Sequence, residues 1–296
     1  MEKLRVAIIG SGNIGTDLLL KVQRSEFLTC SMFIGRNLSS PGMAKAISLG
    51  IPVSDESIQA IVKNPDLCDL VFDATSAKDA TNHWKILEGI GKIVVDMTPA
   101  KLGGLCIPSV NLEEISTQQN INMITCGGQA SIPIAHLIGK IHKDQVEYIE
   151  VVSSIASRSA GPATRLNLDE YINTTELGLK LFSNAKITKA ILILNPADPC
   201  IDMQTTIFAK IKEPQLVRLR EEIKTLVESI RKYVPGYELL FPPIYENGRL
   251  VVTVKVQGLG DYLPKYAGNL DIINCAAIAV AEEYAKKKQL FETYIN

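Results

Sequence analysis

The sequence lacks an excess of charge of either sign, and it lacks long apolar runs. Its 31 basic and 32 acidic residues are scattered over 296 positions with a net charge of -1, which leaves no basic footprint for nucleic acid or an anionic membrane. No apolar stretch approaches the roughly 18 residues of a membrane span, and the N-terminus lacks the order of a secretory signal. We therefore expect a cytoplasmic protein without a nucleic-acid or membrane partner.

Closely spaced cysteines are also missing. The chain has six cysteines, at Cys30, Cys68, Cys106, Cys126, Cys200 and Cys275. None is part of a CxxC pair, so we expect free thiols and neither a disulfide framework nor a metal site. Cys30, Cys68 and Cys275 stand in apolar runs, the usual setting of a buried cysteine. At most one or two of the six should therefore carry chemistry.

What the sequence does contain is a regular alternation of strand-like apolar runs and segments of helical period. The alternation extends from LRVAIIG to INMITCG and predicts a Rossmann-type, parallel, doubly wound dinucleotide domain over residues 1–130. Beyond Pro133 the strands and amphipathic helices are longer, which predicts a second, α+β domain over residues 131–267, to which the family resemblance described below assigns catalysis and oligomerisation. Residues 268–296 read as a final helix. The predicted fold class is α/β.

One glycine motif stands where a dinucleotide would bind. Gly10-Ser11-Gly12-Asn13-Ile14-Gly15 follows a predicted strand and opens a predicted helix. In this setting the first glycine permits the tight turn, the second lets the backbone approach a pyrophosphate, and the third allows close helix packing. The six residues are therefore candidates for binding NAD or NADP. The alternative is a glycine-rich turn without a ligand.

In such folds, residues at the end of the second strand contact the ribose and distinguish NAD from NADP. Here the strand end reads Gly35-Arg36-Asn37, without the acidic residue that NAD specificity usually places there. Arg36 could pair with a 2′-phosphate, which would favour NADP, or it could simply be solvated. Asn37 can still hydrogen-bond a ribose hydroxyl, so NAD and NADP both stay open.

Cys126 differs from the other cysteines in its surroundings. It stands in NMITCGGQASIP, between a strand-like run and the expected start of a helix. We expect Ser131 to cap that helix and Pro133 to lie in its first turn, and a helix N-terminus stabilises a thiolate. A thiolate that adds to an aldehyde gives a thiohemiacetal, which passes hydride to a nicotinamide and leaves a thioester. We therefore expect Cys126 to be a nucleophile rather than a buried filler.

Few other residues are candidates for catalysis. Asp73, in VFDATSA, ends a predicted strand where doubly wound sheets bind ligands, but it could equally cap the next helix. The three histidines, His83, His136 and His142, stand outside any catalytic motif, and exposed or packed helix positions are the better interpretation of each. The sequence leaves the general base open.

Eight collinear segments resemble one enzyme family. They are SGNIGTDLLLKV, VFDATSA, DMTPA, VNLEE, NMITCGGQASIP, SRSAGPATR, ILNPADP and GLGDYLPKYAGNLDI. Across nearly the whole chain they resemble the acylating acetaldehyde dehydrogenases that work beside 4-hydroxy-2-oxovalerate aldolase. The resemblance implies oxidation of acetaldehyde or another short aldehyde to acyl-CoA with NAD(P) and coenzyme A. It also implies a semialdehyde-dehydrogenase-like fold whose C-terminal helix packs back on the dinucleotide domain, a homo-oligomer, and an aldolase partner.

The resemblance also implies which residues form the site. Cys126 would carry the acyl group, and Ser11–Ile14 would contact the cofactor. Further cofactor contacts are implied for Ser159, Ala160, Gly161, Pro162, Ala163, Thr164, Arg165, Leu166, Asn167 and Asn269. The small residues of the SAGPATR loop suit a close approach to a cofactor, although a plain surface turn is the alternative.

Two residues depart from the family pattern. Relatives have Asp where this chain has Asn37, and an active-site Asp where it has Thr205. Asp202 stands three residues before Thr205, but an odd offset on a strand reverses the face, so it is a poor substitute. Besides the coenzyme A reaction, two functions stay open. One is a semialdehyde dehydrogenase or acyl-phosphate reductase that uses phosphate, and the other is a catalytically impaired dinucleotide-binding partner of the aldolase.

Overall fold

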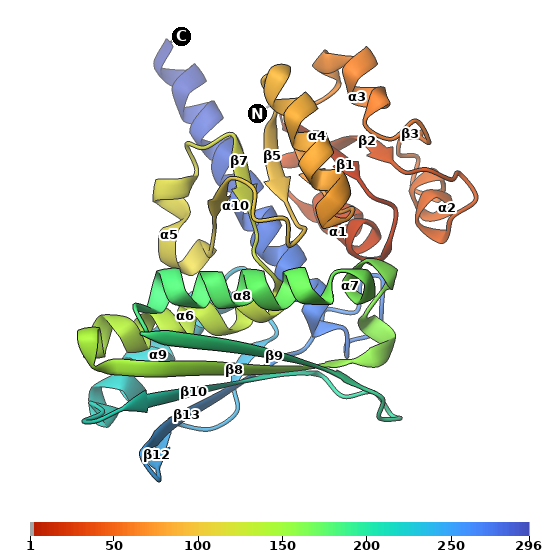
Figure 1. The fold of residues 1–296 in the computed structure, drawn as a ribbon. Helices are drawn as coiled ribbons and strands as arrows, with labels where there is room; N and C mark the ends of the chain where they lie inside the picture. The colour runs from red at the N-terminus through yellow and green to blue at the C-terminus, as the bar shows by residue number, and fades with distance from the viewer. Residues whose placement is uncertain (1–2, 296) are drawn as a thin grey trace. The chain divides into compact units, whose positions relative to one another are not determined.

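The apolar runs of the N-terminal part form a seven-stranded sheet in the order β3-β2-β1-β4-β5-β7-β6. The computed structural model describes residues 3–295, apart from the side chains of residues 163 and 291–295. Every neighbouring pair in this sheet is parallel (Figure 1), which confirms the doubly wound sheet expected from the alternation. The strands are β1 (Leu4–Ile9), β2 (Leu28–Ile34), β3 (Val53–Ser54), β4 (Leu70–Asp73), β5 (Ile93–Asp96), β6 (Gly104–Leu105) and β7 (Asn120–Asn122).

Helices connect these strands, as parallel pairing requires. They are α1 (Asn13–Arg24), α2 (Pro41–Ser48), α3 (Gln59–Lys63), α4 (Ala77–Gly89) and α5 (Pro108–Ile115), with a 3-10 turn η1 (Pro65–Leu67). Local sequence explains where two of them begin. Ser40 caps α2 by accepting from the Met43 amide, with Pro41 in the first turn, and Ser76 caps α4 by accepting from the Asp79 amide.

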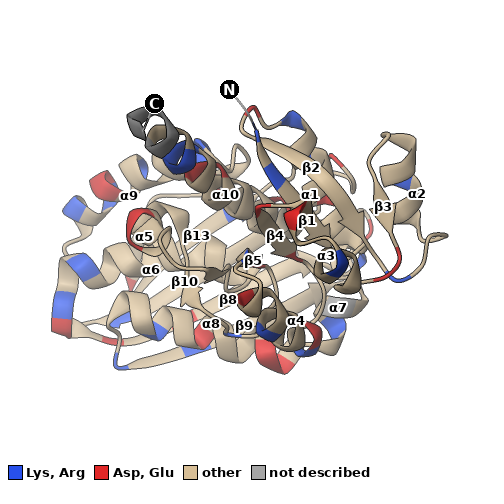
Figure 2. Ribbon diagram, turned by 90° about the horizontal axis from the view of Figure 1, so that it is seen from above, with Lys and Arg blue, Asp and Glu red and all other residues tan. Residues whose placement is uncertain are grey.

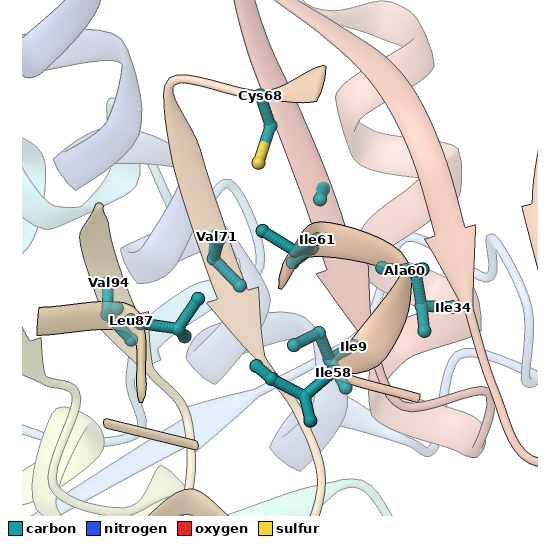
Figure 3. Close-up of a cluster of buried hydrophobic side chains, with 10 residues drawn as sticks. Ile9, Ile34, Ile58, Ala60, Ile61, Cys68, Val71, Leu87 and Val94 are labelled. Atoms are coloured by element: carbon teal, nitrogen blue, oxygen red, sulfur yellow. The ribbon is translucent and has the colours of Figure 1, made fainter. Parts of the chain in front are cut away.

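One face of the parallel sheet is buried under α3 and α4. The branched side chains of the strands meet those of the two helices in a single apolar cluster (Figure 3). Cys68 belongs to this cluster at 1% exposure, so its thiol is a packing group as expected. The buried members are Ala7, Ile9, Ile34, Ile58, Ala60, Ile61, Cys68, Val71, Leu87 and Val94.

The last helix, α10 (Gly268–Ile295), belongs to the N-terminal unit from Asn274 onward. Asn274 donates to an Asp17 carboxylate oxygen over 2.6 Å, and Asp17 also pairs with Lys21 over 2.8 Å although both side chains are buried. Farther along, Glu282 accepts from Ser25 over 2.7 Å. These polar contacts fix the helix on α1 because buried polar groups need partners.

The second sheet is mixed and carries its strands in the order β11-β13-β10-β8-β9, with β12 beside β13. β8 and β9 are parallel, and the other pairs are antiparallel. The burial of β10 alternates along its length, which is typical of a sheet that packs on one face. The strands are β8 (Val146–Ala156), β9 (Ile187–Asn195), β10 (Met203–Ile211), β11 (Tyr237–Leu239), β12 (Ile244–Glu246) and β13 (Arg249–Val256).

Helix α6 (Cys126–His142) is the central helix of the second unit. It packs on β8 and β10 and against α8 (Leu168–Ser183) and α9 (Leu216–Arg231). Nearly all of α6 is buried, which explains why its sequence is apolar on every side. Short turns complete the unit: η2 (Lys143–Gln145), η3 (Ser157–Ser159) and α7 (Pro162–Leu166).

The chain divides into two compact units, Met1–Met123 with Asn274–Asn296 and Ile124–Ile273. The first division lies before the expected border after residue 130, because α6 begins at Cys126 and packs within the second unit, and the second division lies inside α10, beyond the expected border after residue 267. No helix in the described part of the chain is long and apolar enough to cross a membrane. Basic and acidic residues are interspersed on the elements seen in Figure 2.

Candidate active site

The turn between β1 and α1 gives each glycine of the motif a different environment. Gly10 has φ +117°, and a Cβ there would lie 2.5 Å from the Ala74 carbonyl oxygen. A Cβ on Gly15 would lie 1.8 Å from the Gly10 carbonyl oxygen. Gly12 is the N-cap of α1 without a side-chain cap, and a Cβ there would meet no described atom within 4 Å. The space beside Gly12, at the start of α1, is therefore open, and the start of a helix suits a phosphate.

The end of β2 carries the residues that we expect to contact the ribose and to distinguish NAD from NADP. Arg36 and Asn37 are both exposed. The Asn37 side-chain oxygen accepts hydrogen bonds from the Ser39 amide over 2.9 Å and the Ser39 hydroxyl over 2.6 Å. Ser40 donates to Ser11 of the glycine motif over 3.2 Å. Asn37 therefore holds the shape of its own loop, while the guanidinium of Arg36 is accessible to a ligand.

Cys126 is the first residue of α6, and Thr125 before it is the N-cap. The Thr125 hydroxyl oxygen accepts from the Gly128 amide over 2.9 Å. The expected cap was wrong: Ser131 lies inside the helix, where its hydroxyl donates to a carbonyl of the preceding turn, and Pro133 also lies inside. Burial of the whole helix outweighs the low helix propensity of the glycine pair, so the helix starts earlier than the glycines suggested.

The turn that leads into α6 is strained. Ile124 has φ +63°, a region that β-branched residues seldom adopt. Its side chain is buried, and a Cβ on Gly128 would lie 2.8 Å from Ile124 Cγ2. Backbone strain of this kind persists where packing holds a functional group in place. Here it directs the chain so that Thr125 caps the helix and Cys126 begins it.

The thiol of Cys126 has one side-chain hydrogen-bond partner in the described chain. Its Sγ lies 3.5 Å from the Tyr171 hydroxyl of α8, and the same hydroxyl oxygen accepts from the Gly127 amide over 2.9 Å. Cys126 is partly exposed, whereas Cys30, Cys68, Cys106 and Cys275 are buried. Burial raises the pKa of Cys126, and the hydrogen bonds of Tyr171 and the Gly127 amide oppose that rise. The helix start alone therefore does not make a ready thiolate.

Two further hydroxyls lie beside the start of α6. A Cβ on Gly127 would lie 2.3 Å from the Tyr171 hydroxyl and 2.8 Å from that of Ser153 on β8. The Ser153 hydroxyl is 3.1 Å from the hydroxyl of Thr205 on β10, and both residues are buried. Thr205 is thus connected to the start of α6 by its contact with the Ser153 hydroxyl. Asp202 precedes β10 and accepts from an exposed Gln257, so it does not replace the buried hydroxyl.

The loop from Ser159 to Asn167 is short, ordered and closed on itself. Its arginine, Arg165, donates to the Ala160 carbonyl over 3.1 Å and to the Ser157 carbonyl over 2.8 Å. Gly161 and Thr164 are partly exposed, Pro162 is exposed, and the side chain of Ala163 lies outside the described part. Leu166 is 83% exposed. The guanidinium is therefore used to shape the loop, and the apolar Leu166 faces away from the core of its unit.

Asn269 is the most informative of the implied cofactor residues. It lies in the first turn of α10 and is 5% exposed. Its side-chain oxygen has no hydrogen-bond partner in the described part of the chain. A buried amide oxygen without a partner costs free energy, so a donor supplied by a ligand would stabilise it.

The sequence did not reveal a buried polar cluster at the carboxyl ends of β4 and β5. Asp73 accepts from Thr75 and lies 2.7 Å from His83 Nδ1, whereas Ser76 is the cap of the next helix. Asp96, the register partner of Asp73, accepts from Thr98 and from an amide of β7. Burial and the neighbouring Asp73 raise the pKa of Asp96 to about 7.

The histidines occupy packed positions. His142 is buried, with Nδ1 2.8 Å from the Ile138 carbonyl, and its Nε2 accepts from the Gln215 amide. His136 Nδ1 contacts the Phe182 carbonyl. His142 is therefore a satisfied core histidine, and His136 is held by a backbone group.

Comparison with known proteins decides the family. Residues 126–264 match the model of the prokaryotic acetaldehyde dehydrogenase dimerisation domain. An acetaldehyde dehydrogenase of Pectobacterium atrosepticum is 62% identical over 283 residues, which cover 95% of each chain. This chain belongs to the acetaldehyde dehydrogenase family. The family member of Spirochaeta aurantia is 60% identical over 96% of each chain, and that of Geobacillus stearothermophilus is 46% identical over 99% of this chain and all of that one.

The fold of this chain is similar to that of two solved semialdehyde dehydrogenases. The aspartate semialdehyde dehydrogenase of Candida albicans, solved with NADP, superposes with a TM-score of 0.66 at 12% identity, over 96% of this chain and 99% of that one. Aspartate semialdehyde dehydrogenase II of Vibrio cholerae gives 0.61 at 13% identity, over 96% and 100%. The fold expected from the resemblance is confirmed.

In this acetaldehyde dehydrogenase, the second unit brings together residues that the sequence keeps apart. Cys126, Ser153, Tyr171 and Thr205 come from four separate elements. Tyr171 and Ser153 were missed because each stands in a regular helix or strand without a motif. A faint signal was the spacing of Tyr171 and Thr175, four residues apart on one face of a predicted helix.

Proposed function

We propose that this acetaldehyde dehydrogenase oxidises acetaldehyde or another short aldehyde to acyl-CoA with Cys126 as the nucleophile. The observation that carries the proposal is the position of Cys126, partly exposed at the first residue of α6 and in contact with the Gly127–Tyr171 pair. The other cysteines of the described chain are buried, except for Cys200. Cys200 follows the Asp198–Pro199 peptide in a loop, away from any helix start.

The chemistry follows from the properties of the thiol. The Cys126 thiolate adds to the aldehyde carbon, and the carbonyl electrons move to oxygen to give a thiohemiacetal. Loss of hydride from that carbon, for which NAD or NADP would be the acceptor, re-forms the carbonyl and leaves a thioester on Cys126. The coenzyme A thiolate then attacks the thioester carbon, and acyl-CoA forms as the Cys126 thiolate leaves. Amides at the start of α6 can stabilise the negative charge that develops on sulfur.

The residues of the chain fit a nicotinamide cofactor. Gly12 leaves the start of α1 open, and the buried oxygen of Asn269 needs a donor. NAD or NADP would supply the hydride acceptor. We assign the phosphate contacts to Gly10–Gly15, and further contacts to Arg36, the loop Ser159–Asn167, and Asn269. The accessible Arg36 guanidinium favours the use of NADP beside NAD.

We also propose a homo-oligomer, with a 4-hydroxy-2-oxovalerate aldolase as a partner. The match of residues 126–264 to a dimerisation domain supports self-association. Analytical ultracentrifugation of the purified chain tests the first part, and co-purification of the two co-expressed proteins tests the second. A monomer at micromolar concentration would contradict the oligomer.

The reaction is tested by following NAD(P)H formation with acetaldehyde and longer aldehydes. We expect turnover that requires coenzyme A and gives acyl-CoA by mass spectrometry. Turnover that requires phosphate instead and yields acyl phosphate would assign the chain to the phosphate-using reductases. Cofactor binding without turnover under either condition would show that the chain is a dinucleotide-binding protein that does not catalyse the reaction.

A further inference from the structure

Tyr171 is the residue that nothing in the sequence marked and that lies against the proposed nucleophile. It stands in the first turn of α8, is 7% exposed, and directs its hydroxyl at the start of α6. That hydroxyl lies 2.9 Å from the Gly127 amide and 3.5 Å from the Cys126 Sγ, and it also makes a hydrogen bond with the Thr125 side chain. The question is where the phenolic proton goes.

The Gly127 contact uses a lone pair of the Tyr171 oxygen. An amide N–H can only donate, so in this contact the phenol is the acceptor. Its own proton is left for another acceptor, and the Cys126 Sγ lies within reach of it. A sulfur acceptor forms longer hydrogen bonds than oxygen does, so 3.5 Å is a normal length for this contact.

Neighbouring hydroxyls do not compete for this role, because their protons are already assigned. The Thr175 hydroxyl donates to the Tyr171 carbonyl over 2.7 Å. Thr175 must then accept from the Thr125 hydroxyl, which lies 2.7 Å away, while the Thr125 oxygen accepts from the Gly128 amide. These contacts form one directed chain that ends at a backbone carbonyl, and within it the Thr125 hydroxyl, which also contacts the Tyr171 hydroxyl, gives its proton to Thr175.

Tyr171 stays protonated through the working pH range. Burial and the neighbouring Cys126 raise the pKa of Tyr171 well above its ordinary value of 10. A phenol in this state offers a proton to a thiolate without giving it up. When Cys126 ionises, its thiol proton therefore goes to solvent, and Tyr171 keeps its own.

We propose that Tyr171 stabilises the Cys126 thiolate by a hydrogen bond that the Gly127 amide orients. The proposal deepens the proposed function, since it takes Cys126 to be the nucleophile. The same donor acts twice in that reaction, first on the attacking thiolate and again on the thiolate that leaves when coenzyme A attacks the thioester. Tyr171 thereby offsets part of the rise that burial imposes on the thiol pKa.

Charged groups on the surrounding elements are too distant or too exposed to take this part. On α8, Asp169 and Glu170 precede Tyr171 and are exposed. On α6, the ionisable residue nearest in sequence is His136, ten residues along and about 15 Å up the helix axis. On β8 and β10, the residues beside the helix start are the neutral Ser153 and Thr205.

The test is the pH dependence of Cys126 alkylation by iodoacetamide, read at Cys126 by mass spectrometry in the full-length protein. We expect Tyr171→Phe to move the midpoint upward by about one to two pH units, so that alkylation below the midpoint slows about 10- to 100-fold. Tyr237→Phe is the matched control. Tyr237 is equally buried, and its hydroxyl donates to the Ala130 carbonyl of the same helix, away from the thiol. Its midpoint should equal that of the wild type.

An unchanged or lowered midpoint in Tyr171→Phe would overturn the proposal, as would an equal shift in Tyr237→Phe. If Tyr171→Phe does not fold by circular dichroism, site-specific replacement of Tyr171 by fluorotyrosine preserves the shape and strengthens the donor. The midpoint should then fall, and a midpoint that stays in place would contradict the proposal. Alkylation is measured without aldehyde or cofactor, so this result is independent of whether Cys126→Ser shows Cys126 to be the nucleophile.

Discussion

Two helices of this chain have glycines at or within their first turn, and they differ in what lies against those glycines. At α1 a Cβ on Gly12 would meet no described atom within 4 Å, and no side chain caps the helix. At α6 the Thr125 side chain caps the helix, and a Cβ on Gly127 would overlap both Tyr171 and Ser153. Glycine at the first helix leaves room for an external ligand, whereas glycine at the second admits the protein's own hydroxyls.

The comparison shows how one local pattern serves two purposes. Both turns lead from a strand of the parallel sheet into a helix, and both place amides at a positive helix end. The open end suits a phosphate that arrives with a cofactor. The filled end suits a side chain of the protein that must hold negative charge in one position, and Cys126 occupies it.

The largest expected effect concerns the filled helix start. Cys126→Ser should lower coenzyme A-dependent turnover by about 10³-fold or more, because a hydroxyl is a far weaker nucleophile than a thiolate near neutral pH. Dinucleotide affinity, measured by fluorescence titration, should stay at the wild-type value. Cys200→Ser serves as the control and should retain activity. Inactivation by iodoacetamide with Cys126 unlabelled would contradict the assignment.

A pair of substitutions separates packing from ligand approach at the open helix start. Gly15→Ala should lower the free energy of unfolding by about 3 kcal/mol, because its Cβ would overlap the Gly10 carbonyl. Gly12→Ala should cost about 1 kcal/mol or less in stability, yet raise the KM for the dinucleotide about tenfold by blocking the pyrophosphate. Urea denaturation and initial rates measure the two quantities. Equal KM values in Gly12→Ala and wild type would mean that no phosphate binds there.

A smaller effect is expected where β2 ends. Arg36→Ala should reduce kcat/KM for NADP about tenfold and leave that for NAD nearly unchanged, because the guanidinium can pair with the 2′-phosphate. Arg36→Lys is a useful control, because lysine keeps the positive charge but lacks the paired N–H donors of the guanidinium. The idea fails if the ratio of the two kcat/KM values is the same in all three proteins.

The sequence predicted the open helix start well because its signals are local. Gly10, Gly12 and Gly15 act within one turn, and their roles depend on the strand before and the helix after. The filled helix start was predicted only in part. Cys126 lies at a helix start as expected, but the cap was misplaced at Ser131, since the helix is held by long-range burial that no local propensity reports.

The partners of Cys126 could not be predicted, because the fold alone brings them together. Tyr171 is 45 residues from Cys126, and its hydroxyl arrives because α8 packs along α6. The buried contact of Asp73 with His83 is shorter in sequence but depends on α4 lying over the sheet. Patterns of apolar residues fix which faces are buried, and they leave open which polar atoms meet there.

The smallest expected effect concerns Thr205, where the family resemblance implies an aspartate. The Cys126 pKa is raised by burial, so the thiolate fraction, and with it the acylation rate, should rise from neutral to alkaline pH. In Thr205→Asp a carboxylate would stand beside Ser153, which lies against the start of α6. It can accept the thiol proton through the Ser153 hydroxyl, so activity at neutral pH should rise by about threefold. Rates from pH 6 to 10 measure this.

An opposing effect of the same substitution sets the choice of control. A buried carboxylate repels a thiolate and would raise the thiol pKa, which lowers the rate at neutral pH. Thr205→Asn has nearly the same shape as Thr205→Asp without the charge, so the difference between the two variants isolates the carboxylate. A gain in Thr205→Asp alone supports proton acceptance, and a loss in Thr205→Asp alone supports repulsion. If both variants titrate and turn over like the wild type, the Thr205–Ser153 contact does not communicate with Cys126, and the role of the relatives' aspartate does not transfer to this strand.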